Sequence, residues 1–423
     1  MSEHPLDRTL LLLQLDAFPG LDLAAAARTI MTTRVKITAD ESSLSSNGGQ
    51  TALTATFLAL SQMGLRITLD VPDVPVFRSQ PPLCGGGGIH TALTRHAADL
   101  IQPCVSDGAH DMVIALGAAD AGADSYRLHG SDWGARIELD GGPKPWTAES
   151  PIGGALAGVL AGSAALPIIV RRLEVDQRLA APDQFRAVRP VVAIELPSLD
   201  VSKPLDVGDV DVISGGAITN AALFALLRCD LDGRFRVFDN DRCEITNLNR
   251  YVLMRRSDIG ALKVQNLERL TTDRFLIKGV PQRYDTRSQL ELGPCVLVGA
   301  DNIQTRHVVQ STNPNWLHVG GTTHFEVIST SHSGSEPCAG CLHPRTAVAD
   351  PGVIPTISFV SLLAGTLQAY ALLAHVTGKA CPGYYCWAIN LGGPSGVVAF
   401  RPRASPDCPL ACEASQCLRV DAA

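Results

Sequence analysis

The apolar positions of the chain form the same series of elements twice. In the first series, a Gly-Gly turn at Gly48 opens an apolar, helix-like run, and the short strand that follows ends at Asp70. In the second series, a similar turn at Gly215 opens a similar run, and the next strand ends at Asp239. The spacing from glycine to aspartate is 22 residues in the first series and 24 in the second. A repeated turn, helix and strand predicts two related βαβ units.

Three further matches follow in the same order. Apolar, strand-like runs end at Gly117 and Gly299, a tryptophan comes next in each half (Trp133 and Trp316), and each half then contains a helix rich in small residues. Any two βαβ units share some of these features, but four in one order favour a duplication. The pattern therefore predicts an α/β fold of two Rossmann-like halves, each a mostly parallel sheet flanked by helices, packed as a pseudo-dimer.

Length and composition fit this organisation, and we assign the halves to residues 1–195 and 196–423. Hydrophobic residues make up 46% of the chain and charged residues 18%, which supports a large buried core and argues against disorder. The net charge of −7 gives no electrostatic reason to expect nucleic acid or an anionic membrane as a partner. We read neither a signal peptide nor an apolar run of membrane-spanning length, and expect a cytoplasmic protein.

The second glycine turn is a candidate phosphate-binding loop. Gly215 and Gly216 follow an apolar strand and precede a helix, so backbone N–H groups at a helix N-terminus could approach a phosphate closely. Ser214 and Thr219 occupy the first and last glycine positions of the fuller motif, so the turn alone fits a packing turn equally well. Asp239, at the end of the next strand, occupies the position of an acid that binds ribose hydroxyls.

An ordered set of polar residues continues from this strand. Asp241 lies two residues beyond Asp239 and points to the same side of an extended chain. Asn247 supplies an amide, and Arg250 and Lys263 supply cations that could neutralise the charge growing on a triphosphate as pyrophosphate departs. Asp301 ends a later strand at the sheet edge that faces a ligand, where it could hold Mg²⁺. Each residue alone could be a solvated turn charge, but the ordered set indicates an ATP site.

This set resembles the ubiquitin-activating-enzyme-like adenylyltransferases of the ThiF and MoeB type. The resemblance rests on D-x-D, N-x-x-R, a lysine after a glycine, Ala-Asp-Asn with Arg306 following, C-x-x-C and a small-residue helix, over residues ~205–415. It implies ATP-dependent adenylation of the C-terminal carboxylate of a ubiquitin-like protein, for transfer to a conjugating-enzyme-like acceptor. It places the nucleotide roles on the residues named above, with Arg250, Lys263 and Asp301 as the catalytic ones.

The first half lacks the matching chemistry. Asp70 is followed by neither N-x-x-R nor a lysine, so this half resembles the inactive partner half of two-halved activating enzymes. Such enzymes often borrow an arginine from the partner half, and Arg28 and Arg34 are the candidates we consider.

Two cysteine pairs predict a structural zinc site. Cys338 and Cys341 form a C-x-x-C, and Cys408 and Cys412 a C-x₃-C; two such pairs suit a tetrahedral Zn²⁺. The extra residue in the second pair leaves Cys417 open as an alternative fourth ligand.

The step after adenylation is open. Activating enzymes commonly transfer the acyl group to a cysteine between the C-x-x-C and the small-residue helix, but residues 343–356 contain none. Thr346 could form an oxyester, Cys381 a thioester, or the acyl-adenylate could pass directly to a partner.

Two other functions also remain open: an NAD-dependent oxidoreductase would use the turn and Asp239, and a non-catalytic scaffold would use neither half for chemistry.

Overall fold

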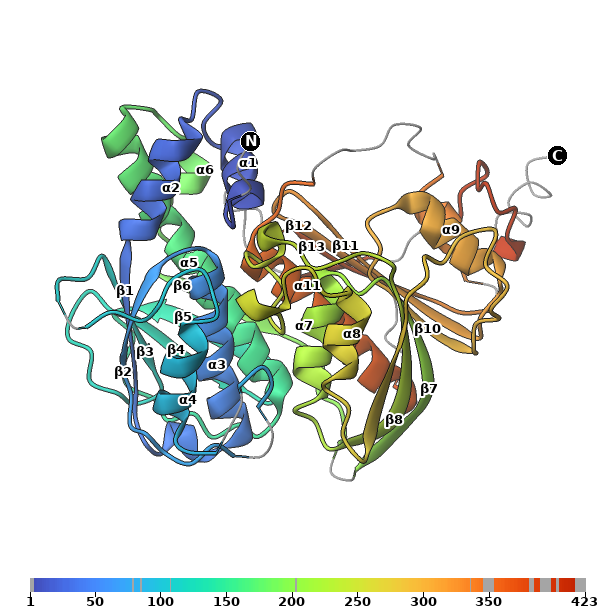
Figure 1. Ribbon diagram of the computed structural model, residues 1–423, viewed down its shortest axis with the longest axis horizontal. Coiled ribbons are helices and arrows are strands. Elements are labelled where there is room, and N and C mark those ends of the chain that lie inside the picture. Colours follow the sequence, from blue (N-terminus) through green and yellow to red (C-terminus); the bar gives the residue numbers. More distant parts are fainter. Residues whose placement is uncertain are drawn as a thin grey trace.

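A computed structural model shows two α/β halves side by side (Figure 1). The structure describes residues 4–77, 80–83, 86–106, 108–201, 204–334, 336–344, 354–379, 384–388, 397–400 and 403–414.

The first half contains a six-stranded sheet in the order β2-β1-β3-β4-β5-β6. Strands β2, β1, β3 and β4 are parallel, and β5 and β6 complete the sheet as antiparallel strands. The strands are β1 (Arg34–Ala39), β2 (Arg66–Asp70), β3 (Met112–Leu116), β4 (Tyr126–Ser131), β5 (Gly134–Leu139) and β6 (Val191–Glu195).

The second half contains an eight-stranded sheet in the order β14-β13-β12-β11-β10-β7-β8-β9. Strands β9, β8, β7, β10 and β11 are parallel, and the last three are antiparallel. The strands are β7 (Leu205–Ile213), β8 (Leu231–Phe238), β9 (Phe275–Val280), β10 (Cys295–Val298), β11 (Trp316–Thr323), β12 (Glu326–His332), β13 (Tyr384–Ala388) and β14 (Val397–Phe400).

Four apolar helices form the core between the two sheets (Figure 1): α3 (Asn47–Gln62), α5 (Pro151–Gln177), α7 (Ala217–Leu226) and α11 (Ser358–Val376). Small residues let them pack closely. A Cβ atom on Gly365 would lie 2.4 Å from the Cβ of Ala221, and one on Gly162 would lie 2.7 Å from the Cβ of Phe359. Because the second of these contacts joins α5 to α11, close helix packing holds the two halves together.

Shorter helices connect and cover these elements. The α-helices are α1 (Asp7–Asp16), α2 (Leu23–Thr32), α4 (Ile89–Ala97), α6 (Asp183–Arg186), α8 (Lys263–Glu268), α9 (Ile303–Ser311) and α10 (Ala339–Leu342). The 3₁₀ helices are η1 (Ser43–Ser45), η2 (Ile245–Asn247) and η3 (Arg256–Asp258).

The predicted α/β fold of two Rossmann-like halves is confirmed. In each half, a strand, a helix and a parallel strand follow in the same order (β1, α3, β2 and β7, α7, β8). The glycine turn predicted for the first half was wrong, because Gly48 and Gly49 lie inside the first turn of α3, whereas Gly215 and Gly216 precede α7. The tryptophan match was wrong, because Trp133 lies in the β4–β5 hairpin whereas Trp316 begins β11. The equivalent elements there are β4 and β11, each parallel to the strand before it.

Two described helices, α5 and α11, are long and apolar enough to cross a membrane by length and composition. The sequence-based statement that no run approaches this length was therefore wrong. Of their most apolar 18-residue windows, 83% and 89% respectively is buried inside the protein. The core between the two sheets accounts for this apolarity, since helices that are hydrophobic on all sides are also typical of the centre of large domains.

Candidate nucleotide site

A polar cavity of about 140 Å³ lies at the carboxyl ends of the parallel strands of the second half. The strand order changes direction here, because β8 lies on one side of β7 and β10 on the other. In open α/β sheets, such a switch point is where ligands bind. The cavity is lined by Arg8, Ser214, Gly216, Ala217, Ile218, Asp241, Arg250, Tyr251, Lys263, Gly299, Asp301, Arg306, Gly321, Thr322, Ile354, Thr356 and Ser361.

Five of the residues predicted from the sequence line this cavity together: Gly216, Asp241, Arg250, Lys263 and Asp301. They come from five separate points along 86 residues of the chain, and the fold brings them to one edge of the sheet. The other three predicted residues, Gly215, Asp239 and Asn247, do not line the cavity and instead hold the neighbouring backbone through hydrogen bonds.

Asp239 fixes the glycine turn from behind. Its Oδ2 accepts a hydrogen bond from the Gly215 N–H at 2.8 Å, and its Oδ1 accepts one from the Asp241 N–H at 2.8 Å. The side chain is 7% exposed. Its observed role is thus to hold two cavity segments in register, and the binding of a ribose hydroxyl stays a prediction.

The turn itself leaves room for a ligand. The nearest atoms to a Cβ atom on Gly215 would be those of Asp239 and Lys263, at 3.4 Å, and the nearest to one on Gly216 would be Ser214 Oγ, at 3.1 Å. Helix α7 begins directly after Gly216, and no side chain caps its N-terminus. The first residues of α7 line the cavity, so its N-terminal N–H groups and the positive end of its dipole are available to an anion there.

Two cations border the turn. Arg250 donates from Nη1 to the Thr246 carbonyl oxygen at 2.8 Å and to Asn249 Oδ1 at 2.6 Å, and burial lowers its pKa to about 10. Lys263 Nζ lies 2.7 Å from Asp241 Oδ2. Burial opposes the charge of Lys263, but the neighbouring Tyr251, Asp239 and Asp241 raise its pKa above the usual range. Both side chains stay positively charged at neutral pH.

Tyr251, which we did not predict from the sequence, lies between these cations. Its ring centroid is 5.2 Å from Arg250 Cζ and 6.0 Å from Lys263 Nζ, within the range of cation–π attraction. The ring therefore helps to hold both cations at the cavity wall.

Asn247 does not line the cavity. Its Oδ1 accepts from the Glu244 N–H at 2.9 Å, which makes it the third residue of a capping box on η2. This contact shapes the loop that carries Arg250.

Asp301 and Arg306 also line the cavity. Asp301 is exposed and, among the described residues, makes no hydrogen bond or ion pair, so its oxygens are available to a ligand. Arg306 is buried, donates from Nε to the Ala300 carbonyl oxygen at 3.0 Å, and lies 3.0 Å from His343 Nε2. Burial lowers the pKa of Arg306 to about 10, so it remains a cation.

The first half contributes Arg8, which sequence reasoning missed. Arg8 lies on α1, lines the cavity, and donates to the Ile354 carbonyl oxygen at 3.3 Å, while its Nε has no hydrogen-bond partner in the described chain. The borrowed-arginine candidates Arg28 and Arg34 were wrong, since neither lines the cavity. The position of α1 against the second half depends on tertiary packing, and no local pattern around Arg8 reveals it.

The corresponding glycines of the first half, Gly48 and Gly49, lie in the first turn of α3 and are packed against other backbone. A Cβ atom on Gly48 would lie 2.3 Å from the Ala148 carbonyl oxygen, and one on Gly49 would lie 1.7 Å from that of Ser43. The carboxylate of Asp40 is occupied by hydrogen bonds from Ser43 and Ala118. The described backbone thus occupies the space that is open beside Gly215.

This difference predicts opposite results for two matched substitutions. Gly49→Ala should destabilise the protein by about 1–3 kcal/mol or more, because the new methyl group meets a backbone oxygen that cannot rotate away. Gly215→Ala should cost less than about 1 kcal/mol, since its contacts at 3.4 Å are ordinary packing distances. Thermal unfolding of the two variants checks this, and equal losses would contradict the structural difference between the turns.

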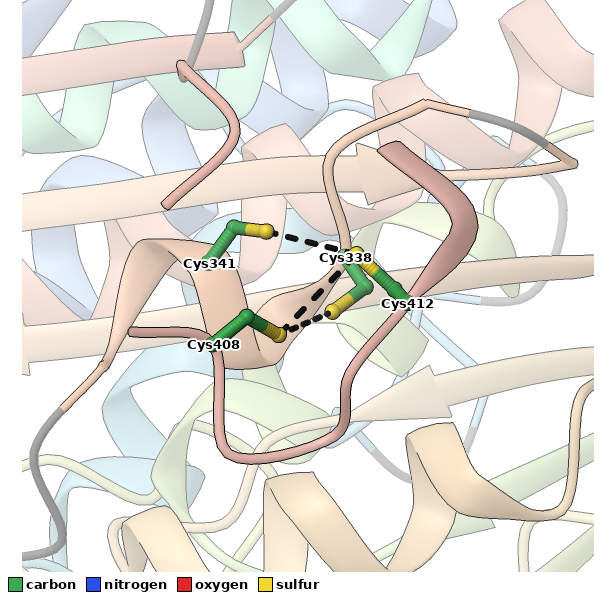
Figure 2. Close-up of side chains that lie close together, drawn as sticks. All are labelled: Cys338, Cys341, Cys408 and Cys412. Atoms are coloured by element: carbon green, nitrogen blue, oxygen red, sulfur yellow. Dashed lines mark hydrogen bonds between the residues drawn. The ribbon is translucent and has the colours of Figure 1, made fainter. Parts of the chain in front are cut away.

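The four predicted zinc ligands form a compact cluster (Figure 2). The Sγ atoms of Cys338, Cys341, Cys408 and Cys412 lie within 4.8 Å of one another, and the Cys338–Cys408 and Cys341–Cys412 pairs are 3.5 and 3.4 Å apart. Ligands at about 2.3 Å from a tetrahedral Zn²⁺ would be roughly 3.8 Å apart, so the cluster fits this ion. Cys412 is the fourth member; the alternative Cys417, as well as Thr346 and Cys381, lies outside the described residues.

The fold defines the second half as a Rossmann-like α/β domain with a polar cavity at the switch point of its sheet. Comparison with known proteins is more specific, because residues 205–410 match the ThiF family. This part of the chain is a ThiF-family domain, which confirms the resemblance seen in the sequence.

Individual proteins are similar to parts of the chain. The chain is 29% identical over 197 residues to the sulfur carrier protein adenylyltransferase of Thermus thermophilus, covering 41% of this chain and 70% of that protein. It is 29% identical over 150 residues to the uncharacterized protein y4jF of Sinorhizobium fredii, covering 34% of this chain and 29% of that protein. Among solved structures, E. coli MccB with MccA-N7isoASN matches with a TM-score of 0.40 and 17% identity, covering 48% of this chain and 66% of that one.

Proposed function

We propose that this protein uses ATP to adenylate the C-terminal carboxylate of a ubiquitin-like protein. The observation that carries the proposal is the single cavity that collects Arg8, Arg250, Lys263 and Asp301 beside an open glycine turn. These three cations, together with Arg306, and the carboxylate of Asp301 suit a nucleoside triphosphate with its metal ion. The similarity to a sulfur carrier protein adenylyltransferase supports the same reaction class.

The chain's own groups divide the work of the reaction. The N-terminus of α7 at Gly216 receives phosphate oxygens, and Arg250 and Lys263 stabilise the negative charge that grows as the α-phosphate is attacked and pyrophosphate leaves. The attacking carboxylate is already ionised, so the reaction needs no general base. Asp301 supplies the oxygen ligands that Mg²⁺ prefers, and the ion would screen the phosphates when bound.

The first half serves as a structural partner that also completes the site. Its own glycines, Gly48 and Gly49, are packed against other backbone, and its Arg8 reaches the cavity of the second half. In this proposal one chain supplies both the nucleotide-binding half and the neighbouring half that contributes an arginine to it.

The transfer step is proposed to use an external, conjugating-enzyme-like acceptor. Burial raises the pKa of Cys104 and Cys243 to about 11 and that of Cys295 to about 12. These thiols stay protonated near neutral pH and are poor nucleophiles. We also propose that the cysteine cluster binds a structural Zn²⁺.

ATP–pyrophosphate exchange tests the proposed function. Purified protein with Mg²⁺ should catalyse exchange only when a ubiquitin-like protein with a free C-terminal glycine is present, and C-terminal amidation of that protein should abolish it. Asp301→Ala should reduce exchange by about 100-fold or more, because it removes the proposed metal ligand. Absence of exchange with every candidate partner, together with binding of NAD in place of ATP, would support the oxidoreductase alternative.

A further inference from the structure

A chain of buried hydrogen bonds runs from the first half to the phosphate-binding arginine of the second. Thr9 of α1 accepts at its Oγ1 from Asn249 Nδ2, at 3.0 Å. The other atom of the same amide, Asn249 Oδ1, accepts from Arg250 Nη1 at 2.6 Å. Asn249 Nδ2 also lies 3.3 Å from the Thr356 carbonyl oxygen. The Thr9–Asn249 hydrogen bond therefore joins two residues that are 240 positions apart in the sequence.

The chemistry of the amide makes its orientation depend on Thr9. Arg250 can only donate, so the amide oxygen must face the guanidinium and the amide nitrogen must face the other way. There the nitrogen meets two acceptors, Thr9 Oγ1 and the Thr356 oxygen. Without the hydroxyl, a buried amide N–H loses an acceptor, and rotation of the amide would place its donor against a cation.

Arg250 has few other groups to fix it. Arg250 is 7% exposed, and within the described chain its guanidinium donates to the Thr246 carbonyl and to Asn249, both neutral. A buried cation that is held by neutral acceptors keeps its charge available to an anionic ligand. The direction in which it presents that charge is set by these two hydrogen bonds.

We propose that Thr9 is a positioning residue for the nucleotide site: through Asn249 it fixes the guanidinium of Arg250 toward the phosphates. The inference rests on the proposed function, since it names how the first half supports ATP binding. Helix α1 carries Arg8 beside Thr9, and the Arg8 carbonyl accepts from the Thr356 N–H at 3.3 Å. Docking of this one helix therefore adds one cation to the cavity and orients a second.

The test compares Thr9→Val with Thr9→Ser by isothermal titration with Mg–ATP. Valine keeps the shape of threonine and removes the hydroxyl, whereas serine keeps the hydroxyl. Thr9→Val should weaken ATP binding about 10-fold, because loss of the Thr9–Asn249 hydrogen bond also weakens the charge-assisted bond of Asn249 to Arg250, and Thr9→Ser should stay near wild type. Thr54→Val, another buried threonine of the first half whose hydroxyl donates to Gln50, is the matched control and should bind ATP normally.

A double-mutant cycle separates positioning from a loss of fold. In an Arg250→Lys background, where the planar fork is absent, Thr9→Val should cost less than about 2-fold further. Should Thr9→Val not fold, Thr9→Cys replaces it, because a thiol is a weak acceptor of similar size to serine. Equal ATP affinity of the valine and serine variants, or fully multiplicative effects in the cycle, would overturn the inference. Failure of the wild-type protein to bind ATP would instead refute the proposed function.

Discussion

Lys263→Ala is expected to reduce partner-dependent pyrophosphate exchange by about 100-fold or more, because it removes a cation positioned where phosphate charge would develop. Lys263 begins α8 and reaches the cavity with 12% of its side chain exposed. Its ammonium group contacts Asp241 and lies 3.9 Å from Asp239. Loss of the lysine would leave Asp241, which lines the cavity, and the nearby Asp239 without this counter-charge, so repulsion of the phosphates adds to the lost attraction.

Two companion variants show whether the charge or the shape of Lys263 matters. Lys263→Arg keeps a cation and should retain more exchange activity than the alanine variant, although the planar group fits the contact with Asp241 differently. Asp241→Asn in the Lys263→Ala background should recover part of the loss, because one of the two opposing carboxylates becomes neutral. Exchange at the wild-type rate in Lys263→Ala would remove this lysine from the proposed mechanism.

The sequence predicted the elements that depend on local pattern. The strand ending at Ile213, the helix starting at Ala217 and the strand ending in the Gly-Ala-Asp301 run are all present within a few residues of their predicted bounds. Apolar periodicity and a Gly-Gly turn determine these features, and both can be read along the chain. The tandem arrangement of the halves followed for the same reason.

Residues that act across the fold could not be predicted in this way. Arg8 belongs to helix α1, and no sequence pattern around it indicates contact with residues 354–356. The observed contact of Asp239 with the glycine turn was not predicted either, for a related reason. Its position at a strand end is legible in the sequence, but its partner, the N–H of Gly215, depends on how closely two loops approach. The contacts of Arg8 and of Asp239 both depend on how segments far apart in the sequence approach each other in the fold.

The sequence also gives only part of the reason why a ligand cavity lies beside the glycines of the second half and not beside those of the first. From sequence, the first turn differs from the second mainly in the residues that follow Asp70. The structure adds a stronger reason, since η1 and the segment around Ala148 occupy the space beside Gly48 and Gly49. An inserted short helix cannot be recognised as an obstruction until the fold brings it against the turn.

Cys412→Ser is expected to abolish tight zinc binding and to lower the stability of the second half by about 3 kcal/mol or more, roughly 10 °C in melting temperature. The four cysteines come from two segments 70 residues apart, and few apolar side chains surround them. A metal ion would therefore supply much of the energy that joins α10 to residues 408–412.

Cys417→Ser is the matched control, because both cysteines were candidates for the fourth ligand in the sequence. The observed cluster contains Cys412, so Cys417→Ser should keep one zinc per chain and a wild-type melting temperature. Metal content by mass spectrometry and thermal unfolding distinguish the two. The reverse result would assign the fourth ligand to Cys417.

The metal also affects the cavity, because α10 leads directly to His343, whose ring lies 3.0 Å from Arg306. Loss of zinc should therefore loosen a cation of the nucleotide site as well.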